Sequence, residues 1–153
     1  MNAMATSETT LVWPGLKAFY ASLSEVTYAL MRVVIGYILF MHGWSKIGMG
    51  ADAVAKGVMA SNHLQPAIGF AYAAMGLETV GAVCIIIGLL TRVFAAALAI
   101  EMAIALLFVH ASHGFAAGQG GYEYVLLLGI VLFVIAIRGG GRYSVDRMIG
   151  KEI

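Results

Sequence analysis

The sequence predicts an all-α polytopic membrane protein, folded as a bundle of four transmembrane helices. Hydrophobic residues make up 61% of the chain and charged residues only 11%, whereas soluble domains carry about 25% charged residues. The apolar residues form four runs, each near the length of about 20 residues that a helix needs to cross a bilayer. These runs are rich in Ala, Gly, Leu, Ile and Met, a composition that favours packed helices over barrel strands.

The first two predicted spans have recognisable starts. The first covers residues 26–44, and Ser22 and Glu25 before it have the spacing of a capping box. The second covers residues 67–90, and Pro66 has the position of a first-turn proline. We expect the outer loop between them to be polar and flexible in its first half.

The last two predicted spans differ in their ends. The third covers residues 93–109, and a tight turn at Thr91-Arg92 joins it to the second span as a hairpin. The fourth covers residues 122–137 and stops at the glycines 139–141. It is short of the usual crossing length of about 20 residues.

The distribution of basic residues predicts the orientation, because cytoplasmic loops carry an excess of Lys and Arg. With the N-terminus inside, the inner side holds Lys17, Arg92, Arg138, Arg142, Arg147 and Lys151, and the outer side holds Lys46 and Lys56. We therefore expect both termini in the cytoplasm. Residues 1–22 form an N-terminal tail, residues 23–138 the transmembrane domain, and residues 139–153 a C-terminal tail. The apolar spacing over residues 16–23 fits an interfacial helix, and a loosely ordered tail is the alternative.

Composition and motif spacing also indicate which partners and cofactors the sequence gives no sign of. The net charge of +1 gives no indication of a nucleic-acid partner. The single cysteine, Cys84, lies within an apolar run, where a packing role is expected and an internal disulfide is excluded. No haem or iron–sulfur signature spacing is present.

Glutamates within the apolar runs are the strongest indication of a site. A carboxylate in hydrocarbon costs several kcal/mol unless it is protonated, paired or hydrated. Glu78 and Glu101 both fall near the bilayer midplane, on the two arms of the hairpin. They can share one polar core with Arg32. Either this core is a charge network that fixes helix register, or it handles protons and contacts a ligand.

A polar stripe along the first span points to the same core. Arg32, Gly36, Leu39, Gly43 and Lys46 fall within about 60° of one another on a helix. The glycines allow a neighbouring helix to approach closely, so the stripe should face inward. Pairing with a buried glutamate is the expected state of the deeper arginine. The lysine lies at the outer mouth, where snorkelling to the interface is the alternative.

A second group of polar residues maps to the outer ends of the spans. His42, His110, His113 and Glu123 can bind a metal or relay protons, with His110 and His113 as a candidate ligand pair. The alternative is that they are loop residues bonded to the backbone. Tyr122, Glu123 and Tyr124 open the fourth span, where an aromatic belt and a helix-start carboxylate are the simpler interpretation.

Three stretches of the sequence, in order along the chain, carry a resemblance to a known family. LMRVVIGYILFMHGWSKIG is similar to the first span of DoxX proteins, with its R…G…F…HG..K pattern. ETVGAVCIIIGLLTRVFAAALAIEM resembles their second and third spans, and HASHGFAAGQGGYEYVLLLGIVLFVIAIRGGGRYSVDRMI their last third. The resemblance covers residues 28–149. It implies a four-helix protein of the bacterial inner membrane, related to subunits of thiosulfate:quinone oxidoreductase or terminal quinol oxidase, with other members in thiol and sulfur redox balance.

Three functions remain open from the sequence. The first is a redox-linked, quinone-interacting subunit, a candidate part of an oxidoreductase, with a redox partner subunit or a second copy of the chain beside it in the lipid. The second is a non-catalytic scaffold or assembly partner, and the third a small proton, metal or solute transporter. The candidate catalytic residues are Glu78 and Glu101. The predicted polar pocket comprises Arg32, His42, Lys46, Glu78, Glu101, His110, Tyr122 and Glu123.

Overall fold

The computed structural model describes residues 11–152, and no strand occurs among them. The α-helices of this part are α1 (Lys17–Met49), α2 (Ala51–Val54), α3 (Ala67–Gly76), α4 (Ala82–Ile87), α5 (Thr91–Ile104), α6 (Glu123–Arg138) and α7 (Val145–Ile149). Three π-helical segments lie at Ala55–Met59, Leu77–Gly81 and Ala105–His110. Short 3-10 turns lie at Pro14–Leu16, Ala60–Asn62, Ala111–His113 and Ala117–Gln119.

Three continuous helical stretches of residues 11–152 are long and apolar enough to cross a membrane: Pro14–Met49, Ala67–Ile87 and Thr91–His113. The all-helical fold is therefore confirmed, with three candidate membrane spans among the described residues. Helix α6 has 16 residues, which gives a length of roughly 24 Å against a hydrocarbon core of about 30 Å. A fourth span through α6 remains a prediction.

The N-terminal part of α1 differs from the prediction. Residues 16–23 do not form a separate interfacial helix, because α1 runs without interruption from Lys17 to Met49. Ser22 lies inside this helix and donates to the carbonyl of Phe19 at 2.8 Å, so the capping-box prediction was wrong. No glycine or proline occurs between Leu16 and Ile35, and nothing local therefore ends the helix.

The first outer loop is helical rather than flexible. Residues 51–62, here called the roof segment, form α2 and the π-helical and 3-10 turns that follow it. Val54, Ala55 and Met59 share one face of this segment and pack with Leu64 against Ala71 and Ala74 of α3. This apolar periodicity explains why the segment folds onto the bundle.

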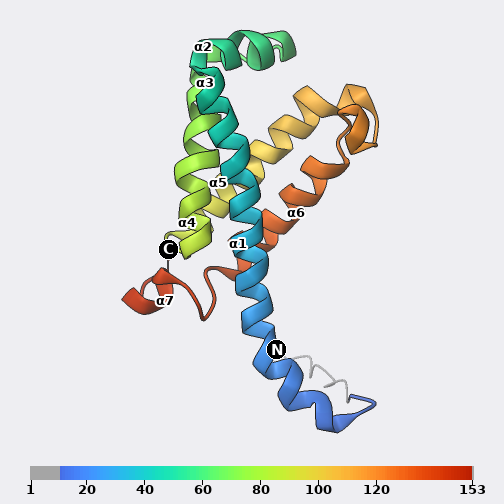
Figure 1. Cartoon of the computed structure of the whole chain (residues 1–153), viewed down its shortest axis with the longest axis vertical. Coiled ribbons are helices and arrows are strands. Elements are labelled where there is room, and N and C mark those ends of the chain that lie inside the picture. Colours follow the sequence, from blue (N-terminus) through green and yellow to red (C-terminus); the bar gives the residue numbers. More distant parts are fainter. Residues whose placement is uncertain (1–10, 153) are drawn as a thin grey trace, which may run out of the picture.

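The bundle is built from two helix pairs. Helix α1 packs along α4 and the π-helical segment before it, while α5 packs chiefly on α6. Figure 1 shows the two pairs crossing near the middle of the molecule and diverging toward the end that carries α2. The main core lies where they cross, and its most buried side chains include Leu39, Ile85, Leu98, Leu132 and Ile135.

Glycines on α1 set the register of the first pair. A Cβ atom at Gly36 would lie 2.7 Å from Cγ1 of Ile86, and one at Gly43 would lie 2.7 Å from the carbonyl carbon of Glu78. The backbones therefore touch at both positions, as the predicted stripe required. This antiparallel contact places the upper part of α1 directly beside Glu78.

We expect Gly43→Ala to lower the free energy of unfolding by about 2 kcal/mol, because the added methyl group clashes with backbone atoms that cannot move independently. Gly48→Ala is the matched control on the same helix, since nothing lies within 4 Å of its added Cβ. The control should be neutral or stabilising by up to about 1 kcal/mol, through helix propensity alone. Reversible unfolding in mixed micelles measures both, and equal effects would contradict the close contact.

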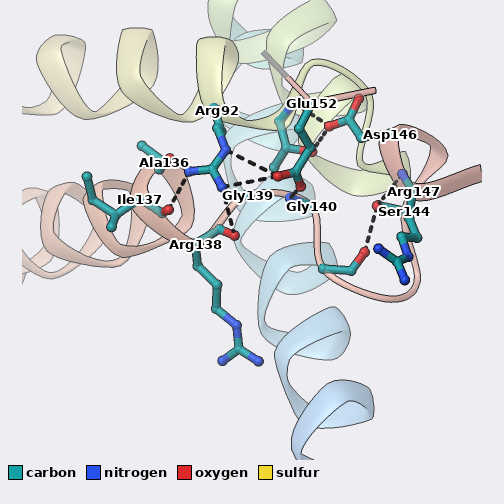
Figure 2. Close-up of polar contacts among 12 residues, drawn as sticks. Arg92, Ala136, Ile137, Arg138, Gly139, Gly140, Ser144, Asp146, Arg147 and Glu152 are labelled. Carbon is teal, nitrogen blue, oxygen red and sulfur yellow. Dashed lines mark hydrogen bonds and ion pairs between the residues drawn. The ribbon is translucent and has the colours of Figure 1, made fainter. Parts of the chain in front are cut away.

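Residues 139–152, here called the C-terminal segment, fold across the ends of the helices that meet at the α4–α5 turn. The Arg92 guanidinium donates to the carbonyls of Ala136 at 3.3 Å and of Ile137, and it pairs with Glu152 at 3.1 Å. Glu152 also accepts from the Gly140 amide at 3.0 Å. Figure 2 shows these contacts converging from α5, α6 and the end of the chain. The segment is thus an integral part of the bundle.

The hairpin turn lies earlier than predicted. Helix α4 ends at Ile87, the backbone takes positive φ angles at Gly88 and Leu90, and α5 already begins at Thr91. Asp146 holds this start, accepting from the Leu90 amide at 2.7 Å and from the Thr91 amide and hydroxyl at 2.9 and 2.7 Å. A carboxylate from α7 therefore caps α5.

Candidate functional site

A cavity of about 420 Å³ lies between the diverging halves of the two helix pairs, under the roof segment. Most of its lining is apolar. Helix α1 contributes His42 and Lys46 to its polar lining, α5 contributes Glu101, and α6 contributes Tyr124. The π-helical segments Leu77–Gly81 and Ala105–His110 contribute Glu78 and His110. The cavity thus gathers most of the predicted polar pocket.

Glu78 and Lys46 form an ion pair at the wall of the cavity. Glu78 lies on the π-helical segment Leu77–Gly81 and is only 5% exposed. The Lys46 ammonium donates to Oε2 of this carboxylate. Lys46 therefore does not snorkel away from the bundle but neutralises a buried charge. Since π-helical turns within α-helices are frequent at functional sites, the local helix geometry also marks this position.

Glu101 projects from α5 into the same cavity, and its bonding is incomplete. Its Oε2 atom is buried and has no hydrogen-bond partner among the described residues. A buried polar atom without a partner is uncommon in proteins and is costly. Within a cavity, this atom is the natural contact for a polar group of a bound molecule.

The outer end of the cavity carries the histidines. His42 and Tyr124 lie across the gap between α1 and α6, with ring centroids 6.3 Å apart. His110 ends the π-helical segment after α5, and its Nδ1 lies 2.6 Å from the carbonyl oxygen of Gly120. Both histidines line the cavity.

Arg32 does not belong to this cavity, so the predicted core shared by Arg32, Glu78 and Glu101 was wrong. Its guanidinium is 1% exposed and donates to the carbonyls of Ile85 at 2.7 Å and Tyr143 at 2.5 Å. The antiparallel register places Arg32 at the inner end of α4, roughly 21 Å along α1 from Lys46 at 1.5 Å per residue. Arg32 joins the C-terminal segment to the bundle instead of pairing with a glutamate.

Three other candidates lie outside the cavity, in or beside the second outer loop. His113 is exposed, with Nδ1 3.0 Å from the Val109 carbonyl oxygen. Glu123 accepts from the Ala117 amide at 3.1 Å, and Tyr122 packs edge-on against Phe115 at 5.6 Å. These contacts shape the loop, as the simpler interpretation expected.

His110 and His113 have no third potential metal ligand grouped with them in the described part of the chain. Across residues 11–152, no group of three or more His, Cys, Asp or Glu side chains is arranged to hold a metal ion. Metal binding by His110 and His113 remains a prediction.

Tyr124 is the cavity residue that the sequence interpretation missed. It was assigned to the interfacial aromatic belt together with Tyr122. Tyr124 and Leu128 lie one helical turn apart and line the cavity with Val125, so the helical period of α6 was the available signal.

Fold and site together define a helical membrane protein with a largely apolar cavity in one half of its bundle, into which a few polar side chains converge. The chain belongs to the DoxX family, whose model matches residues 27–111. That range contains the cavity residues of α1, of the π-helical segment Leu77–Gly81 and of α5.

Two similar proteins come from Haemophilus influenzae, and both are described as uncharacterized proteins. One is 32% identical over 131 residues, which cover 84% of this chain and 86% of the relative. The other is 30% identical over 128 residues, covering 81% of this chain and 91% of the relative. No solved structure matches the chain.

Proposed function

We propose that this protein is a redox-linked membrane subunit that binds a quinone or quinol head group in the cavity. The observation that carries the proposal is the unpartnered Glu101 Oε2 beside the Lys46–Glu78 pair, in a cavity of about 420 Å³. A quinone ring requires an apolar pocket with a few hydrogen-bonding groups and one group that exchanges protons. Cavity size and donor set both fit this ligand.

Each polar residue of the cavity has a defined part in the proposal. A bound quinone supplies reversible two-electron, two-proton chemistry. Lys46 is placed to donate a hydrogen bond to a ring oxygen, and Glu101 to exchange a proton with the opposite one. His42 and His110 lie toward the outer end and can pass protons between the cavity and water.

The proposal includes the membrane arrangement predicted from the sequence. Helix α6 is the fourth span and crosses a locally thinned bilayer, as short apolar helices do. The protein lies in a bacterial inner membrane, with Lys17, Arg138 and the C-terminal segment on the cytoplasmic side, following the excess of basic residues there. The cavity then opens in the outer half of the bilayer.

Electrons reach the cavity from a partner. The sequence has no haem or iron–sulfur signature, and the proposal therefore assigns the electron donor to a redox partner subunit in the same membrane. Affinity purification from native membranes should recover a stoichiometric redox protein. Recovery of the chain only as a homo-oligomer would contradict this part of the proposal.

We expect Glu101→Gln to weaken the binding of a soluble benzoquinone analogue at least tenfold in purified protein reconstituted in nanodiscs. The loss corresponds to about 1.4 kcal/mol, within the range of about 0.5–1.5 kcal/mol for one hydrogen bond. Asp52→Asn is the control, because this carboxylate is exposed on the roof segment, outside the cavity. A binding titration followed by tryptophan fluorescence or calorimetry measures the effect.

Two results would contradict the proposed function. One is the absence of saturable binding to the unmodified protein. The other is equal affinity in the Glu101→Gln and Asp52→Asn variants. Either would favour the scaffold or transporter alternatives, which proteoliposome flux under a pH gradient can separate.

A further inference from the structure

The two sides of the cavity that face the surrounding lipid are closed very differently. On the side between α1 and α6, the rings of His42 and Tyr124 lie 6.3 Å apart and bridge the two helices. Both are large and polar at one edge. This side therefore presents a barrier to a hydrocarbon chain.

The side between α3 and α5 has no such barrier. The backbones of the two helices make few direct contacts, because α5 meets the second span through α4 and the π-helical segment Leu77–Gly81. Only at the end near the roof segment does Ile104 of α5 pack against the apolar cluster that includes Ala71 and Ala74 of α3. The lining residues facing this gap include the small Ala73 and Ala97, and Ile100, which is 62% exposed at the rim. Figure 1 shows α3 and α5 diverging from their closest approach. The cavity thus reaches the protein surface through an apolar opening.

The outer end of the cavity is covered instead. Val58 and Met59 of the roof segment and Leu64 beside it line the cavity from that end, together with Gly120 and Gly121 of the second outer loop. An exposed apolar opening in a membrane helix pair faces acyl chains, not water. The accessible route to the polar groups therefore runs through the hydrocarbon region.

We propose that the ligand is an amphipathic molecule with a long hydrocarbon tail, which enters from the bilayer and leaves its tail in the opening between α3 and α5. This inference rests on the proposed function and adds its substrate class: a membrane-dissolved, tailed quinone or quinol rather than a small water-soluble one. The ring contacts Lys46 and Glu101, and the tail passes Ala73 and Ala97 into the lipid.

Photo-crosslinking in nanodiscs tests the route on the unmodified protein. The probe is a benzoquinone with a ten-carbon tail that carries a diazirine near the ring. We expect labelling within residues 70–77 and 97–104, suppressed by an excess of the tailless analogue. Suppressible labelling confined to α1 and α6 around His42 and Tyr124 would overturn the route while leaving the proposed function intact. Labelling that the analogue does not suppress would contradict the proposed function itself.

A pair of tryptophan variants tests the same opening by affinity. Ala97→Trp should weaken binding of the tailed probe at least tenfold and binding of the tailless analogue less than twofold. Ala96→Trp is the control, because Ala96 is exposed about 100° around α5 from Ala97, in a groove toward α6 that Ala97 does not line. Equal losses for both probes, or none for either, would overturn the inference. Ala73→Trp, which obstructs the opening from α3, repeats the test should Ala97→Trp not fold.

Discussion

Replacing Lys46 with methionine is expected to lower the free energy of unfolding by about 3 kcal/mol or more, because it leaves the buried Glu78 carboxylate without its partner. The Glu78 side chain is 6% exposed and that of Lys46 19%, so little water is available to replace the lost contact. Methionine keeps most of the lysine's apolar stem, and the effect therefore isolates the charge. Reversible unfolding in mixed micelles is the measurement.

Two further variants distinguish the ion pair from a general sensitivity of this region. Lys56→Met removes an exposed lysine of the roof segment and should change stability by less than about 0.5 kcal/mol. The double variant Lys46→Met with Glu78→Met should recover most of the loss, because replacing both partners of a buried pair is often nearly neutral. If the single variant Lys46→Met behaved like Lys56→Met, the pair would not stabilise the fold.

Convergence of the cavity glutamates could be predicted from the sequence. Residue counting from the hairpin turn places Glu78 and Glu101 both near the bilayer midplane on adjacent antiparallel helices, and a rise of about 1.5 Å per residue makes such counting reliable within a span. The histidines followed for the same reason, since His42 and His110 both end their apolar runs at the outer side. The depth of a residue in the bilayer depends only on its position within its own apolar span, so the sequence of that span is sufficient to predict it.

The partner of Glu78 could not be predicted in this way. Arg32 and Lys46 lie on one stripe of α1, and either can face the second span. The choice depends on the register between α1 and the second span, which the Gly36 and Gly43 contacts set. It also depends on the roof segment, which was expected to be flexible but packs on α3. Register is therefore a result of tertiary packing that single-helix patterns do not contain.

The capping role of Asp146 was also beyond the sequence. Asp146 and Thr91 are 55 residues apart, and no periodic pattern connects them. The C-terminal segment has few apolar residues in series, so it resembled a tail. The only local pattern in this segment is a helix N-cap: Ser144 caps α7 by accepting from the Arg147 amide at 3.1 Å. That pattern predicts a helical turn but not where the turn packs.

Asp146→Asn is expected to lower the free energy of unfolding by about 3 kcal/mol at neutral pH. The Asp146 carboxylate accepts three hydrogen bonds from Leu90 and Thr91 while the residue is 2% exposed. Each bond to a charged group contributes about 1.5–3 kcal/mol, and the amide variant can keep only some of them. Asp52→Asn is the matched control, since its carboxylate is exposed on the roof segment.

The effect should depend on pH with a defined sign. Burial alone would raise the pKa of Asp146, but the hydrogen bonds from Thr91 and Leu90 and the charge of Arg32 outweigh it and hold this pKa below its ordinary value of 3.8. The unfolded chain therefore takes up this proton at a higher pH than the folded protein. The stabilisation is complete above the ordinary value and is lost as pH falls through the folded pKa.

The difference in unfolding free energy between the unmodified protein and Asp146→Asn should thus be large at pH 7 and smaller at pH 3, where the unmodified protein has begun to lose this contribution. Unfolding titrations at the two pH values measure it, and Asp52→Asn should show no comparable change. A difference of the same size at both pH values would mean that the charge of Asp146 is not what caps α5. The contribution would then come from shape and packing of the C-terminal segment alone.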